Sequence, residues 1–396
     1  MLDRRNEPDP AVWLSDSSCS LEEFRAHVEQ RTDPSDCRHA ADIVSNIPVY
    51  DGVQIAKDLK DDADWLPLMA EWNRIWAKGP GIVLVRRGLA DIGLLDAVTD
   101  KLNEIIHEEA IGNGGKGDHF AAAGANSRVW NSHEKLCMKS PELFARYNAN
   151  EFTRRLSEAW LGSGYQITTQ ANVVRPGGKA QIAHRDYHMG FQSEKSLLGY
   201  PATQHALSTH LTLQGAVAHT DMPVESGPTK LLPYSQSYLP GYLAILRPEF
   251  RAYFEENFVQ PPLQKGDMVF FNPATFHAAG ENRTTDFHRF ANLMQVGSPY
   301  GRSIEIVDRV RIAKAVYAPL RRLAASGVLD AREVDNVVAA TAEGYPFPVN
   351  LDIDAPIGGL APPSQQDVMR QALGEGWSAE KFADEIDAHA SRKRSH

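Results

Sequence analysis

The residues with the clearest chemistry in this sequence are His184, Asp186 and His277. His184 and Asp186 lie two positions apart, and in a strand such residues point to the same face of the sheet. We therefore expect them to hold adjacent positions around one metal ion, with His277 as a third ligand from a distant segment. Two imidazoles and one carboxylate on one side of a metal leave the opposite positions open, which is the arrangement expected of a non-haem Fe(II) oxygenase.

Arg289 follows His277 at the start of an apolar segment. A guanidinium is a planar fork that fits a carboxylate through two parallel hydrogen bonds, so an arginine here suggests a keto-acid co-substrate. Arg283 competes for this role, but it falls in a turn, where an arginine is more often solvated. We favour Arg289, because a charged residue in a half-buried strand needs a partner. His288 competes in the same way with His277.

The composition is that of a globular protein, with 396 residues of which 42% are hydrophobic and 23% charged. A formal net charge of −10 argues against nucleic-acid binding, which requires a basic surface. Cys19, Cys37 and Cys137 are widely spaced, so neither a disulfide framework nor a zinc site is indicated, and a reducing cytoplasm fits best. We expect no signal peptide and no membrane anchor, because no apolar run is long enough to cross a bilayer.

Before about residue 166, the sequence predicts an N-terminal extension, helices, one short strand and a Gly-rich loop. Residues 1–50 are polar and are interpreted as an N-terminal extension with one short helix near 21–29. Over 55–76 apolar residues recur at helical spacing, which predicts core packing for Leu59, Leu66, Met69, Trp72 and Trp76. A β-rich run at 82–85 precedes an amphipathic helix. The Gly-rich stretch 112–124 fits neither a dinucleotide fingerprint nor a P-loop, and we expect a loop able to cover an active site.

From about residue 166 to residue 296, the sequence shows short strands bounded by Gly, Pro, Asn or Asp. The predicted strands cover 166–174, 205–219, 229–233, 268–271 and 289–296. Strands at this spacing suggest a jelly roll or another double-sheet barrel. Helical periodicity returns after Pro299, and these C-terminal helices could buttress the barrel, cover its mouth or form the interface of a homo-oligomer.

Gln170 and Asn172 alternate on one face of the predicted strand that precedes His184. Either amide could hydrogen-bond the keto acid or the substrate. The alternative is that both are solvent-facing polar positions of a half-buried strand. The sequence leaves both interpretations open.

Three motifs together resemble the phytanoyl-CoA dioxygenase family of Fe(II)/2-oxoglutarate oxygenases. They are His184-Arg185-Asp186-Tyr187-His188, the run Glu225-Ser226-Gly227-Pro228-Thr229-Lys230-Leu231-Leu232-Pro233, and Gly266-Asp267-Met268-Val269-Phe270-Phe271 followed by His277 and Arg289. The resemblance covers roughly Gly79 to Gly297. It implies an α+β fold with a mainly β core: a double-stranded β-helix, which is a jelly-roll or cupin-like barrel, buttressed by N- and C-terminal helices. The oxygenase domain would then be 51–299, between the extension 1–50 and a C-terminal helical extension, 300–396.

The resemblance also implies a role for each site residue. His184, Asp186 and His277 would bind Fe(II), and Arg289 would bind 2-oxoglutarate, with O₂ as the other co-substrate. Halogenating relatives have a small residue in place of Asp186, so halogenation is disfavoured. The expected reaction is hydroxylation of an unactivated C–H bond of a small molecule, with decarboxylation of 2-oxoglutarate to succinate and CO₂.

Three alternatives stay open from the sequence. Desaturation, epimerisation or cyclisation would use the same protein ligands and differ only in how the substrate is placed. A metal-dependent hydrolase could use the same two histidines and aspartate, but it would have no use for Arg289. A barrel without turnover could act as a binding module, although its site would be free to lose any of these residues.

Overall fold

The structure is a computed structural model that describes residues 9–112, 126–356 and 358–395. The chain divides into two compact units. Of the described residues, 9–88, 126 and 173–291 belong to the first unit, and 89–112, 127–172 and 292–395 belong to the second. Each unit is described by itself below. The Gly-rich stretch predicted to form a covering loop falls almost entirely outside the described residues.

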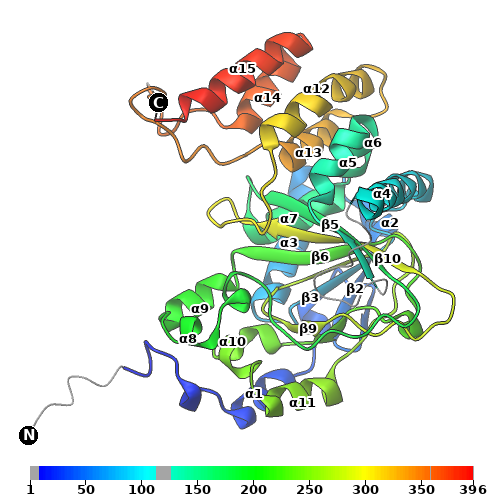
Figure 1. Cartoon of the computed structure of the whole chain (residues 1–396), viewed down its shortest axis with the longest axis vertical. Helices are drawn as coiled ribbons and strands as arrows, with labels where there is room; N and C mark the ends of the chain where they lie inside the picture. The colour runs from blue at the N-terminus through cyan, green and yellow to red at the C-terminus, as the bar shows by residue number, and fades with distance from the viewer. Residues whose placement is uncertain (1–8, 113–125, 357, 396) are drawn as a thin grey trace, which may run out of the picture. The chain divides into compact units, whose positions relative to one another are not determined.

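The first unit contains a twisted mixed sheet (Figure 1). Its strands lie in the order β1 (Asp42–Val44), β2 (Ile47–Asp51), β3 (Ile82–Arg86), β8 (Met268–Phe271) and β6 (Thr212–Ala218), with the start of β10 (Arg289–Gly297) beside β6. β2 and β3 are parallel and the other pairs among β1, β2, β3, β8 and β6 are antiparallel. Strands β1 and β2 were not predicted, and they tie residues 42–50 of the expected extension into the sheet.

A helix rich in tryptophan packs on this sheet. The helix predicted over 55–76 is in fact two helices, α2 (Gly52–Asp58) and α3 (Asp62–Ala77). The break occurs because Asp61 caps α3 in a reciprocal capping box with Asp64, which begins a new helix there. Trp72 and Trp76 are buried as predicted, whereas Leu66 is 62% exposed and the core role predicted for it is wrong.

A second, two-stranded sheet in the first unit carries one of the candidate metal ligands. β7 (Lys230–Leu232) and β9 (Phe276–Ala278) are antiparallel, with Leu231 opposite His277. Phe276 of β9 belongs to an aromatic cluster with Phe24 of α1 (Leu21–Val28) and Phe250 of α11 (Pro248–Asn257). Phe24 stacks on Phe276 with 4.9 Å between the ring centroids. The cluster thereby fixes the strand that presents His277.

The second unit combines strands with eight α-helices of the described part of the chain. β4 (Asn126–Val129), most of β5 (Gln166–Val174) and the later part of β10 lie in the order β10-β5-β4. The helices of this unit are α4 (Ile92–Gly112), α5 (Ser132–Lys139), α6 (Pro141–Asn148), α7 (Glu151–Leu161), α12 (Arg309–Ala325), α13 (Ala331–Thr341), α14 (Gln365–Gly374) and α15 (Ala379–Arg392). The last four lie together in the yellow-to-red part of Figure 1. The predicted mixed α+β class is confirmed, with more helix than the sequence indicated.

A buried histidine in the second unit makes its stability depend on pH. His133 on α5 donates from Nε2 to the carbonyl oxygen of Ala340 at 3.0 Å, and its ring packs edge-on against Phe144. Burial, with the nearby positive charge of Arg309, lowers the pKa of His133 from 6.5 to about 3. The folded protein therefore resists protonation between these values, whereas the unfolded chain binds a proton below about pH 6.5.

We predict that this histidine lowers the free energy of unfolding as the pH falls from about 6.5 toward 3, by up to about 1.4 kcal/mol per pH unit. Urea unfolding of the wild type and His133→Gln across this range measures the effect. The wild type is more stable at pH 7, and its advantage shrinks with acidification because glutamine does not titrate. An advantage that stays constant down to pH 4 would contradict the prediction.

Candidate metal centre

The candidate metal centre is built from two segments of the first unit that run antiparallel. His184 and His277 form a β-bridge in which the backbone N–H of each donates to the carbonyl oxygen of the other, both at 3.0 Å. Two residues further on, the backbone N–H of Asp186 donates to the carbonyl oxygen of Pro273 at 3.0 Å. These three hydrogen bonds bring together the two histidines and the aspartate singled out in the sequence.

The strand predicted for the His-x-Asp triplet is wrong, because only His184 takes part in a bridge. The ladder cannot continue past this point, since the residue that accepts from Asp186 is Pro273, which has no N–H to donate back. The predicted alternation of side chains nevertheless holds. Asp186 lies beside both imidazoles, while Arg185 points to the opposite side and is buried there.

Backbone carbonyl oxygens fix the tautomer of both imidazoles. His184 Nδ1 lies 2.7 Å from the oxygen of Ile182, and His277 Nδ1 lies 2.8 Å from the oxygen of Thr275. A carbonyl oxygen only accepts, so Nδ1 is the protonated donor in both rings and each Nε2 carries a lone pair. This arrangement is typical of metal-binding histidines, whose other ring nitrogen is held by a hydrogen bond.

The Asp186 carboxylate lies between the two lone pairs. Its Oδ1 is 3.8 Å from His184 Nε2, and its Oδ2 is 3.6 Å from His277 Nε2. Burial alone would raise the pKa of Asp186, but the contacts with the two histidines and with Gln214 outweigh it and hold the pKa well below its usual range. Asp186 is therefore a carboxylate at neutral pH. Gln214 Nε2, from β6, donates to Oδ2 at 2.9 Å and orients it.

These three side chains fit a divalent metal ion. The Asp186 oxygens lie 3.8 and 3.6 Å from the two Nε2 atoms, separations that two bonds of roughly 2 Å to a common ion can span. His277 Nε2 is buried and has no hydrogen-bond partner among the described residues, although burying an unpaired polar atom is costly. A metal ion bound by two nitrogens and one oxygen would resolve that cost, and this donor set suits non-haem iron.

Arg289 and His277 differ from their competitors in burial. Arg289, the first residue of β10, is buried, and its Nη1 lies 3.4 Å from the carbonyl oxygen of Ser226 in the second sequence motif. Arg283 and His288 are both exposed. A buried guanidinium is suited to a desolvated carboxylate ligand, whereas an exposed one is suited to water.

Gln170 and Asn172 lie on β5, in the part that belongs to the second unit, and both are buried. The interpretation that they are solvent-facing is therefore wrong, because β5 is covered on both faces. Gln170 Nε2 donates to the carboxylate of Glu305. Asn172 Oδ1 is buried with no hydrogen-bond partner among the described residues, so Asn172 is the amide with hydrogen-bonding capacity left for a ligand.

Gln214 lies beside the centre, and His188 follows Asp186 by two residues. Gln214 was missed because a glutamine in a strand resembles any solvent-facing polar residue, and only the pairing of β6 with β8 places it beside Asp186. His188 is half-buried, with Nε2 3.3 Å from Thr212 Oγ1. Burial lowers the pKa of His188, so its imidazole is neutral at pH 7.

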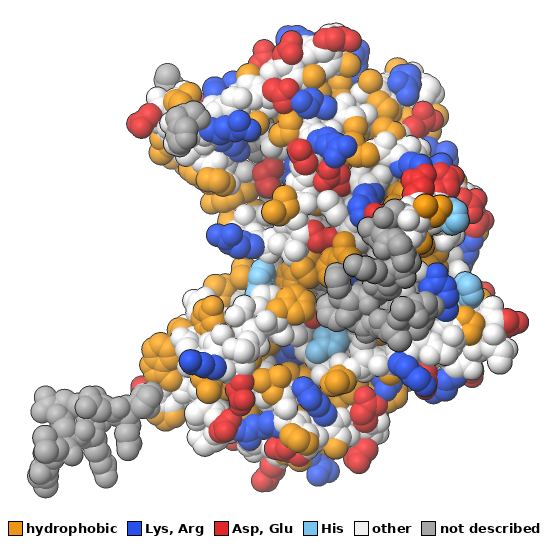
Figure 2. All heavy atoms as spheres, in the orientation of Figure 1, with side chains coloured by type: hydrophobic (Ala, Val, Ile, Leu, Met, Phe, Trp, Pro, Cys, Tyr) orange, Lys and Arg blue, Asp and Glu red, His pale blue; other side chains and the backbone are white. Residues whose placement is uncertain are grey.

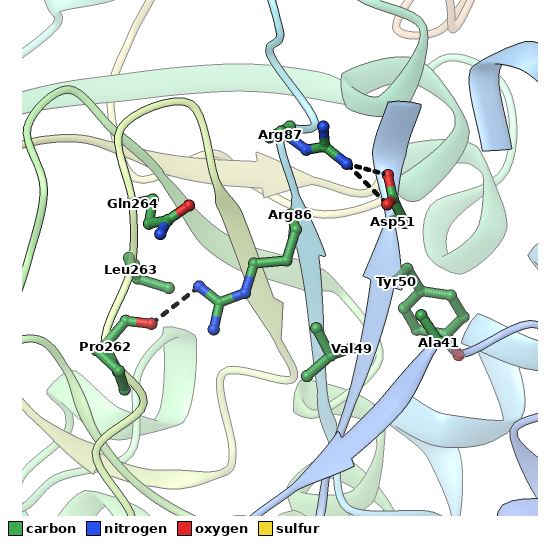
Figure 3. A pocket seen from close by; sticks show the side chains of 9 residues that line it. All are labelled: Ala41, Val49, Tyr50, Asp51, Arg86, Arg87, Pro262, Leu263 and Gln264. Carbon is green, nitrogen blue, oxygen red and sulfur yellow. Dashed lines mark hydrogen bonds and ion pairs between the residues drawn. The ribbon is translucent and has the colours of Figure 1, made fainter. Parts of the chain in front are cut away.

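A separate cavity of about 460 Å³ in the first unit is lined by none of these residues (Figure 3). Its polar walls include Arg86, whose Nη1 donates to the carbonyl oxygen of Pro262, and Arg87, which forms an ion pair with Asp51. Arg86 is also paired with the buried Asp267. Each guanidinium is thus matched by a carboxylate, and the cavity offers no net charge to a charged ligand.

The surface adds little to this assignment. On the face drawn in Figure 2, the described Lys and Arg side chains interleave with Asp and Glu, so the described part of this face carries no broad basic patch. Among the described helices, none is long and apolar enough to cross a membrane.

Two histidines and one carboxylate are the donor set of non-haem Fe(II) oxygenases. The phytanoyl-CoA dioxygenase (PhyH) family model matches residues 78–291, more than half of the chain. The chain belongs to this family, whose members are Fe(II)/2-oxoglutarate-dependent oxygenases that use O₂. The resemblance stated from the sequence is thereby confirmed.

Comparison with solved structures finds enzymes of nogalamycin biosynthesis. The non-haem alpha ketoglutarate dependent epimerase SnoN has 21% identity and a TM-score of 0.39, over 60% of this chain and 84% of that chain. The carbocyclase SnoK has 20% identity and a TM-score of 0.39, over 62% of this chain and 86% of that chain. SnoN has also been solved with Fe3+, alpha ketoglutarate and nogalamycin RO. None of the curated proteins matches this chain.

Proposed function

We propose that this protein hydroxylates an unactivated C–H bond of a small molecule and converts 2-oxoglutarate to succinate and CO₂. The observation that carries the proposal is the buried Asp186 carboxylate within 3.8 Å of both imidazole lone pairs. A carboxylate in this position fills the coordination site that halide would need, so halogenation is disfavoured. Hydroxylation requires no further protein group, because the oxidised carbon can receive its oxygen directly.

In this proposal each residue has one task. His184, His277 and Asp186 hold Fe(II), which supplies the activation of O₂ and the oxidation of the C–H bond. Gln214 keeps the carboxylate turned toward the metal through its 2.9 Å hydrogen bond. Arg289 binds the distal carboxylate of 2-oxoglutarate by its planar fork. Asn172, whose Oδ1 has no hydrogen-bond partner among the described residues, is proposed to contact 2-oxoglutarate or substrate. Gln170 is proposed to have the same role, and its hydrogen bond to Glu305 positions its side chain.

The finer fold and domain predictions belong to the same proposal. The sheet containing β8 and β6 and the two-stranded sheet β7-β9 would be the two sheets of a double-stranded β-helix, with His277 on the smaller one. We divide the chain by function into the extension 1–50, the oxygenase domain 51–299 and the helical extension 300–396. We also propose that the C-terminal helices form a subunit interface. Truncation after residue 299, followed by measurement of solubility and oligomeric state, tests both.

The reaction is tested by incubating the Fe(II)-loaded protein with 2-oxoglutarate, labelled O₂ and a panel of small molecules. Succinate formation above the level without added molecule identifies a substrate. Hydroxylation predicts a product that gains one labelled oxygen atom. Desaturation, epimerisation or cyclisation would give succinate and a product without the label, which would contradict the proposed outcome while keeping the oxygenase chemistry. A hydrolase would convert substrate without 2-oxoglutarate.

A further inference from the structure

Arg185, the middle residue of the His-x-Asp triplet, is a buried cation with no carboxylate partner among the described residues. Its side chain is among the largest in the protein that are essentially inaccessible, with 1% exposure. Nη2 donates to two backbone carbonyl oxygens, those of Ser235 and Tyr238, the latter at 2.9 Å. Nε and Nη1 have no hydrogen-bond partner among the described residues. Among the described residues, the hydrogen bonds of this guanidinium therefore go to carbonyl oxygens and not to a carboxylate.

The guanidinium lies between the two segments that carry the metal ligands. Its Cζ is 5.0 Å from the centroid of the Tyr242 ring and 5.2 Å from that of Phe276, within the range of cation–π attraction. Phe276 immediately precedes His277, and the Tyr242 hydroxyl donates to the carbonyl oxygen of Asp186 at 3.4 Å. Arg185 thus contacts one residue adjacent to the third ligand and a second that holds the backbone of the aspartate.

The surrounding chain is shaped to admit the guanidinium. Gly241, the first residue of α10 (Gly241–Ala244), lies so close that a Cβ there would be 2.0 Å from Arg185 Cζ. Gly241 is not among the residues with positive φ, so backbone conformation alone does not require glycine. The close approach of Arg185 accounts for it.

Stability alone is a poor explanation for this arginine. Burying an incompletely paired charge is costly, and apolar residues of similar volume often replace buried charges without loss of stability. We propose that Arg185 is a positioning residue, which ties the segments of His184–Asp186 and Phe276–His277 to the 235–242 segment and so holds the metal ligands in place before the metal binds. This inference rests on the proposed function, because it assumes that the three residues bind Fe(II).

The test compares anaerobic Fe(II) binding, measured by calorimetry, in the wild type, Arg185→Met and Gly241→Ala, with thermal unfolding of each apoprotein. Gly241→Ala leaves the arginine in the chain but forces its guanidinium out of place. Arg309→Met is the matched control: Arg309 is also buried and also donates to carbonyl oxygens, those of Ile167, Ala340 and Thr341, but it lies in the second unit.

Loss of groups that orient metal ligands typically weakens metal binding about 10- to 100-fold. We expect Arg185→Met and Gly241→Ala each to raise the Fe(II) Kd by about this factor, while Arg309→Met changes only thermal stability. If Arg185→Met does not fold, the Fe(II) Kd values of Gly241→Ala and Arg185→Lys test the inference in its place. Wild-type Fe(II) affinity in the folded Arg185 and Gly241 variants would overturn the inference. Absence of Fe(II) binding by the wild type itself would instead overturn the proposed function on which it rests.

Discussion

Asp186→Ala is expected to abolish substrate oxidation and to weaken Fe(II) binding by at least about 100-fold, the upper end of what loss of even an indirect partner costs. Two effects combine in this variant. The metal loses its only anionic protein ligand, and the two imidazoles lose the carboxylate that lies 3.6 and 3.8 Å from their Nε2 atoms. The measurements are succinate formation with substrate and anaerobic Fe(II) titration of the same preparation.

The matched control for this prediction is Asp42→Ala. Asp42 is an exposed aspartate that accepts a hydrogen bond from the next backbone N–H, so its removal should leave Fe(II) affinity unchanged. The Fe(II) affinity of Gln214→Leu should fall between those of Asp186→Ala and Asp42→Ala, because this substitution removes one hydrogen bond to Asp186 Oδ2 but no metal ligand. Oxidation by Asp186→Ala at the wild-type rate would exclude the metal assignment.

Arg289→Gln is expected to raise the Kd for 2-oxoglutarate at least about 30-fold and to leave Fe(II) affinity nearly unchanged. Truncating one partner of a buried charge pair costs roughly 2 kcal/mol or more, and each 1.4 kcal/mol is tenfold in affinity. Arg289→Lys keeps the charge but loses the planar fork, so we expect an intermediate Kd. Fluorescence or absorption titration of the Fe(II)-loaded protein with 2-oxoglutarate measures the Kd for 2-oxoglutarate in the wild type, Arg289→Gln and Arg289→Lys.

Arg283→Gln is the control that also tests the competing assignment. Arg283 is exposed, and its backbone N–H donates to the carbonyl oxygen of Glu225, a bond that the substitution leaves intact. We expect no change in the Kd for 2-oxoglutarate. If Arg283→Gln weakened 2-oxoglutarate while Arg289→Gln did not, the two arginines would have to exchange roles.

Elements with strong local periodicity were predictable from the sequence. β3 and β8 are continuous β-rich runs, and α12 repeats buried apolar residues along one face, so their positions follow from pattern alone. α5 and α15 were not predicted because their sequences are mostly polar and only a few of their residues are buried. β2 was missed because Pro48 interrupts its pattern, and its pairing with β3 depends on a segment far along the chain.

At the candidate site, too, local spacing could be interpreted from the sequence, whereas contacts between distant segments could not. The spacing of His184 and Asp186 indicated a shared metal, but the ladder that ends at Pro273 could not be read from the triplet. The burial of Arg289 and the exposure of Arg283 separate two arginines that the sequence could only rank. The burial of Arg185 could not be predicted from the triplet, because its enclosure by the 235–242 segment is a tertiary contact.

The central claim is that His184, Asp186 and His277 hold an iron that chelates 2-oxoglutarate. Anaerobic titration of the Fe(II)-loaded protein with 2-oxoglutarate tests it most directly, because the chelate has a weak metal-to-ligand charge-transfer band in the visible range. We predict that the band saturates at one 2-oxoglutarate per bound iron in the wild type and in Asp42→Ala, and that it is lost in Asp186→Ala. A protein that binds one Fe(II) per chain yet shows no band at saturating 2-oxoglutarate would contradict the account.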